Sequence, residues 1–69
     1  MKLALFDVVV LRHPKKLADG KYEEVDTRIV LKDQILAKDE KAAGFLVVRR
    51  IPEADAADPE TIEVLIRPF

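Results

Sequence analysis

The chain has 69 residues, which is enough for one domain with a single core, and we take residues 1–69 as that domain. Hydrophobic residues make up 49% and charged residues 36%, a balance that is typical of folded globular chains and argues against disorder. The net charge of −1 gives no field toward nucleic acid or an anionic membrane, and the lack of cysteine excludes disulfides and thiolate metal sites.

The first predicted element is a strand from Leu3 to His13. At a period of two, its apolar residues divide between two faces: Leu3, Leu5, Val9 and Leu11 on one, and Ala4, Phe6, Val8 and Val10 on the other. Because both faces are apolar, we expect this strand at the centre of a sheet, with each side covered.

A reversal at Asp19-Gly20 leads to a second predicted strand from Tyr22 to Leu31. One of its faces is apolar and the other charged, which suits the edge of a sheet. Residues 35–37 would extend this strand past a bulge at Asp33-Gln34.

A helix is predicted from Glu40 to Ile51, with Asp39 as its N-cap and Pro52 ending it. Gly44 and the β-branched Val47-Val48 pair are weak helix formers, so residues 44–51 alone also fit a strand. We favour the helix because of its caps and its length.

A loop over residues 53–61, with one helical turn after Pro52, leads to a third strand from Ile62 to Arg67. The elements predict an α+β fold with ββαβ order. Its three-stranded sheet has the spatial order 2-1-3, with the helix packed on one face. The pattern leaves the direction of the third strand open.

The residue types needed for catalysis are mostly missing. The chain has no serine or cysteine, only one histidine, and two glycines that do not begin helices, so serine or cysteine hydrolases and glycine-rich phosphate loops are excluded. Asp55, Asp58 and Glu60 are interpreted as a solvated acidic loop, and His13 as the end of a strand. We therefore expect no enzyme, cofactor, metal or small-molecule substrate.

The expected location is the cytoplasm. The apolar run near the N-terminus is interrupted by Asp7 and has no small-residue cleavage site, and no stretch approaches the ~18 apolar residues of a membrane span. We expect no membrane partner.

Basic residues form two clusters, one at the hairpin and one late in the helix. Either cluster could contact phosphate or an acidic partner, but the favoured interpretation is a charged turn and a pair of cations that complement the helix C-terminus. The residues are Arg12, Lys15 and Lys16, followed by Arg49 and Arg50.

Apolar side chains exceed what one helix can cover. If Ala43, Leu46, Val47 and Ile51 face the sheet, Phe45 and Val48 lie on the far side of the helix, and one face of the first strand also needs a cover. We expect these surfaces to bind protein, either a second copy or a larger assembly. The alternative is shielding by long side chains and loops. The expected interface residues are Phe6, Val8, Val10, Phe45 and Val48.

Residues 35–43, 49–53 and 63–69 resemble small proteins of tailed bacteriophages. The resemblance implies a virion component, such as a minor capsid, decoration or tail-associated subunit. The leading hypothesis is thus a non-enzymatic structural or interaction subunit, located in the virion if phage-encoded. The rival is a small regulatory protein that binds nucleic acid or a host protein through the basic clusters.

Overall fold

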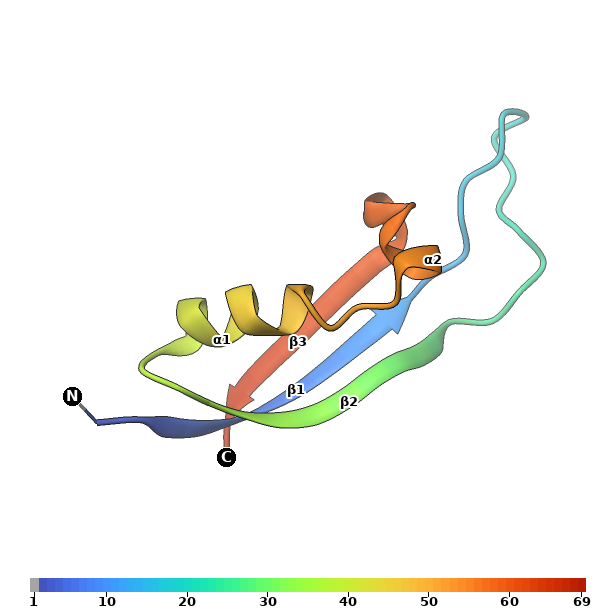
Figure 1. Cartoon of the computed structure of the whole chain (residues 1–69). Helices are drawn as coiled ribbons and strands as arrows, with labels where there is room; N and C mark the ends of the chain where they lie inside the picture. The colour runs from blue at the N-terminus through green and yellow to red at the C-terminus, as the bar shows by residue number, and fades with distance from the viewer. Residues whose placement is uncertain (1) are drawn as a thin grey trace.

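The computed structural model describes residues 2–69. The elements are β1 (Ala4–Arg12), β2 (Arg28–Ala37), α1 (Glu40–Val48), α2 (Glu53–Ala56), the 3₁₀ turn η1 (Pro59–Thr61) and β3 (Ile62–Pro68). The strands form one sheet in the order β2-β1-β3, and α1 lies across one face of it (Figure 1). The predicted α+β fold with ββαβ order is confirmed. Both pairings are antiparallel, which settles the direction of β3.

The core lies between α1 and one face of β1. Phe6, Val8 and Val10 point toward the helix, and Val8 and Val10 are fully buried against a cluster that includes Ala43 and Val47. The expectation that these three strand residues stay free for a partner is wrong. Both faces of β1 are apolar, and a period of two does not indicate which face the helix covers.

The second strand begins later than predicted, at Arg28 and not at Tyr22. Residues 22–27 lie beyond the end of β1, where Pro14 has no N–H to continue the ladder. The pairing shifts from Val10↔Leu31 to Leu11↔Ile29, so the bulge is at Val30 and not at Asp33-Gln34.

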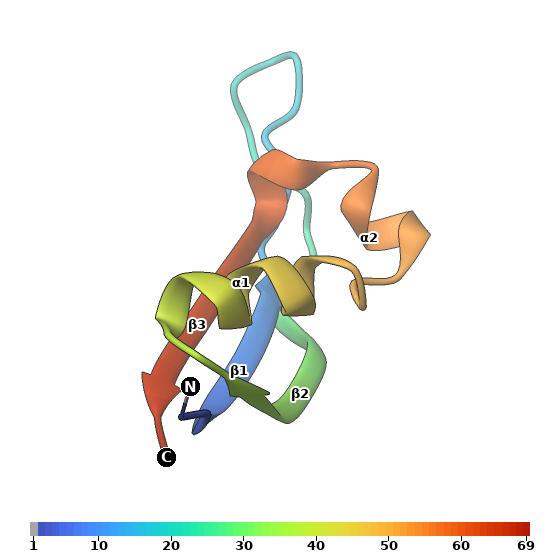
Figure 2. The same cartoon turned by 60° about the vertical axis from the view of Figure 1, so that its left-hand side comes forward.

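Residues 13–27 form an extended arm between β1 and β2 (Figure 2). Its two sides are joined by backbone hydrogen bonds from Leu17 N to Lys21 O (2.6 Å) and from Glu23 N to Lys15 O (2.9 Å). Gly20 closes the tip with a φ of 85°, a conformation that favours glycine. The longest dimension of the molecule is 50 Å.

Helix α1 begins as predicted, because the Asp39 carboxylate accepts a hydrogen bond of 2.8 Å from Ala42 N. The helix ends at Val48, three residues before the predicted end at Ile51, and the chain leaves through a turn in which Arg50 N donates to Val47 O. The helical turn expected after Pro52 is present as α2. Over residues 2–69, no helix is long and apolar enough to cross a membrane.

Candidate interaction surfaces

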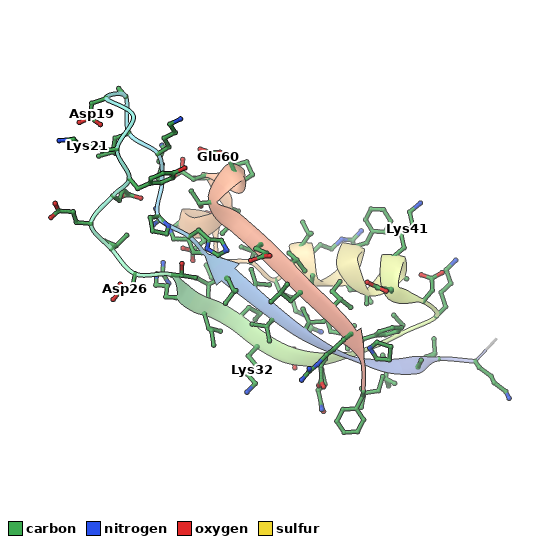
Figure 3. The ribbon with its side chains drawn as sticks, turned by 180° about the vertical axis from the view of Figure 1, so that it is seen from behind. Asp19, Lys21, Asp26, Lys32, Lys41 and Glu60 are labelled. Atoms are coloured by element: carbon green, nitrogen blue, oxygen red, sulfur yellow. The ribbon has the colours of Figure 1, made fainter. Side chains whose placement is uncertain are left out.

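The sheet face opposite α1, here called the open face, is a continuous surface of all three strands. The register places Leu36 beside Leu5 and Leu65 beside Val9 on this face. Figure 3 views the molecule from behind and shows Lys32 pointing to the side of the sheet opposite Lys41 of α1. The open face consists of Leu5, Asp7, Val9 and Leu11 of β1, Ile29, Lys32, Gln34 and Leu36 of β2, and Glu63, Leu65 and Arg67 of β3.

An open groove of about 860 Å³ lies on this face, over the C-terminal half of β3 and the neighbouring parts of β1 and β2. Val9 and Leu65 supply its apolar centre, and Phe69, which is 77% exposed, borders it. The charged side chains are at its margins: Asp7 accepts a 3.1 Å hydrogen bond from Gln34 Nε2 and lies opposite Arg67 in the register. An apolar centre within a polar margin is typical of a surface that binds protein.

The outer side of α1 carries the second apolar surface. Phe45 is 65% exposed and lines a smaller groove of about 340 Å³ together with Leu3 and Leu36. Val48, which is also exposed, follows Gly44 by one turn, and Gly44 approaches Ile66 of β3. The predicted exposure of Phe45 and Val48 is confirmed. Leu46, expected to face the sheet, is instead partly exposed beside Phe45.

Three of the five basic residues that were predicted to contact a partner form ion pairs within the chain. The ion pairs are Arg12 with Glu23 (3.0 Å), Lys15 with Asp58 (2.9 Å) and Arg50 with Asp33. The hydrogen bond from Lys15 to Asp58 raises the pKa of that amine. The pKa of Glu23 is lowered, first by the backbone N–H of Lys15 and then by Arg12.

The remaining two cations, Lys16 and Arg49, are exposed, and within residues 2–69 neither takes part in an ion pair. Lys16 lies on the arm, whereas Arg49 follows α1 at the groove lined by Phe45. The two basic clusters are therefore divided by internal ion pairs and do not form one cationic surface.

The interpretation of the acidic loop as solvated agrees with the exposed Glu60 but is wrong for Asp55 and Asp58, whose carboxylates are paired. Asp55 is 7% exposed, and its Oδ1 accepts a 2.6 Å hydrogen bond from Arg28 Nη2. Asp58 pairs with Lys15, and its carbonyl oxygen accepts from the Thr61 hydroxyl. These acids attach the 53–61 connection to the start of β2 and to the arm. Their partners are distant in sequence, so the local pattern did not reveal them.

His13 joins the arm to the sheet. Its Nδ1 lies 3.0 Å from Thr27 Oγ1, and its Nε2 lies 2.8 Å from Glu63 Oε1. A hydroxyl, an imidazole and a carboxylate in this order match the connectivity of a hydrolase triad. All three side chains are exposed and none lines either groove, so the geometry supports a structural link between arm, β1 and β3.

In the part of the chain that the structure describes, no group of three or more His, Asp or Glu side chains could hold a metal ion. Comparison with known proteins found no matching family model, curated protein or solved structure.

Proposed function

We propose that this chain is a non-enzymatic interaction subunit that buries its open face and the outer side of α1 against copies of itself or a larger assembly. The observation that carries the proposal is the apolar centre of the open face, where Val9 and Leu65 adjoin across two strands. The helix covers only the opposite face.

The energetic argument compares the apolar surface with the stability of so small a domain. Burying one Leu, Val or Phe side chain contributes about 1.5–3 kcal/mol, and a core of this size rarely supplies more than about 3–5 kcal/mol. Leu36, Leu65 and Phe45 are 60%, 47% and 65% exposed. Covering them would contribute an amount comparable with the domain's own stability, which favours a protein partner.

The resemblance to small proteins of tailed bacteriophages fits such a role. A virion subunit works through contacts with its neighbours and needs no catalytic residue. We therefore extend the proposal to a virion component, with a minor capsid, decoration or tail-associated subunit as the specific forms.

The rival function, a regulatory binder of nucleic acid or of a host protein, depends on the basic clusters. Arg12, Lys15 and Arg50 are already neutralised by carboxylates, which leaves Lys16 and Arg49 to contact phosphate. The rival predicts tight binding to a nucleic-acid duplex that weakens steeply with salt as counterions are released.

Light scattering over a concentration series tests the proposal. Wild type should associate, and Val9→Lys on the open face and Phe45→Asp on α1 should each shift association to higher concentration. Lys21→Glu at the arm tip is a matched control that alters charge away from both surfaces and should behave as wild type. If neither apolar substitution changes the association of wild type, these surfaces are not the interface.

A further inference from the structure

Within residues 2–69, the backbone groups on the outer edge of β3 have no hydrogen-bond partner. Phe69 N donates to Leu5 O (3.0 Å) and His13 N donates to Thr61 O (2.7 Å), so residues 61 and 69 direct their backbone groups toward β1. These groups alternate along an antiparallel strand. Leu65 therefore also bonds toward β1, whereas Val64 and Ile66 direct their N–H and C=O groups outward. The outer edge thus offers two donors and two acceptors at the middle of the strand.

The two edges of the sheet differ in how well they are protected against pairing with a strand of another molecule. Beside β2, Arg50 of the turn after α1 pairs with Asp33, and Asp55 of α2 pairs with Arg28. A bulge at Val30 interrupts that strand as well. Charged side chains and bulges are devices by which proteins prevent pairing at an edge. The centre of β3 is the uncharged run Val64-Leu65-Ile66.

The sequence of β3 is complementary to itself when read antiparallel about Leu65. In that register Leu65 faces Leu65 of a second copy, and Glu63 faces Arg67. On the helix side Val64 faces Ile66. Apolar residues therefore face apolar residues, and opposite charges face each other, so every pair in this register is favourable.

We infer that a second copy of this chain pairs with β3, antiparallel and centred on Leu65, to form one sheet in the order β2-β1-β3-β3-β1-β2. The symmetric register makes four backbone hydrogen bonds, because Val64 and Ile66 of each copy exchange bonds with Ile66 and Val64 of the other. Pro68 has no N–H, but it lies at the end of the strand and outside these four bonds.

Pairing would also join the open faces of the two copies. Val9 and Leu65 of one copy would continue into Leu65 and Val9 of the other as one apolar band. Glu63 of each copy would meet Arg67 of its partner at the margin of that band. In the single chain Glu63 uses Oε1 toward His13, and Oε2 is the atom available to a second partner.

This inference rests on the proposed self-association and specifies its geometry. Single cysteines test the register cleanly, because the chain has no cysteine of its own. Residues at a non-hydrogen-bonded antiparallel pair have Cα atoms about 4.5 Å apart, which is within disulfide range. Leu65→Cys should therefore form a disulfide-linked dimer under mild oxidation.

Glu63→Cys is the matched control on the same strand and face. In the inferred register residue 63 lies opposite residue 67, so two copies of Cys at position 63 would be about 13 Å apart and could not bridge. We expect Leu65→Cys to cross-link at least about tenfold faster. Equal rates, or faster linkage at position 63, would overturn the inferred pairing.

Charge reversal gives an independent readout. Glu63→Arg and Arg67→Glu each place like charges opposite one another, and each should weaken self-association roughly tenfold. An equimolar mixture of the two variants restores opposite charges at both positions and should associate as wild type does. His13→Ala controls for loss of the contact to Glu63, and circular dichroism confirms that each variant is folded.

The outcomes separate the two proposals. Suppose that wild type associates and that Val9→Lys weakens this association. If Leu65→Cys then does not cross-link and the mixture of charge-reversed variants does not regain wild-type association, the edge pairing is wrong and the interaction function stands. If wild type remains a monomer and no cysteine variant cross-links, self-association itself is wrong.

Discussion

Val8→Ala and Val9→Ala are neighbouring substitutions that should differ widely in how much stability they cost. Val8 is fully buried beneath α1, whereas Val9 lies on the open face and is partly exposed. Truncating Val8 removes the burial of two carbon groups, about 1.6 kcal/mol, and adds a cavity term, for a total near 2.5 kcal/mol. For a domain of this size that lowers Tm by about 10–20 °C. Val9→Ala should cost less than about 1 kcal/mol.

Thermal and urea unfolding followed by circular dichroism measures the difference. Both variants should be compared at low protein concentration, where self-association does not add to stability. Equal losses for the two variants would refute the assignment of α1 to the face of Val8. On the same reasoning Val8→Lys would unfold the chain, and it is Val9→Lys that reports on assembly.

Arg28→Ala leaves the buried Asp55 carboxylate without its hydrogen bond and should lower the free energy of unfolding by about 1.5–3 kcal/mol in urea titrations, and a loss below about 0.5 kcal/mol would contradict this. Asp39→Ala removes the N-cap of α1 and should cost about 1 kcal/mol by the same assay, whereas Asp39→Asn should largely retain stability. The pKa of Glu23 is lowered from its ordinary value near 4.5, so its stabilising contribution is present above that value and is lost as pH falls through the lowered pKa. Glu23→Gln should therefore reduce Tm at neutral pH, and the difference in Tm between the variant and wild type should narrow as the pH falls below the ordinary value of the Glu23 carboxyl, whereas a difference that stays constant with pH would contradict the assignment.

Features with a local signal in the sequence were predicted well. The Asp39 cap depends on groups within three residues of it, and the sheet order follows from a central strand with two apolar faces. The choice between those faces was not available from β1 itself, since their patterns are alike. It is decided by how Ala43 and Val47 pack, and by side-chain contacts that no periodicity encodes.

The errors in the candidate site have the same origin. Asp55 looks like one of several loop acids until Arg28, 27 residues away, is brought beside it. The paired state of Arg12 similarly depends on how residues 13–27 return along the arm. The exposure of Phe45 could be predicted because one helix presents only one side to the sheet.

Sedimentation of the wild-type chain over a concentration series tests the central claim most directly. The interaction proposal predicts that the mass rises from 7.8 kDa for one chain toward at least twice that value as concentration increases. A mass that stays at 7.8 kDa at every concentration would contradict self-association through the open face and the β3 edge.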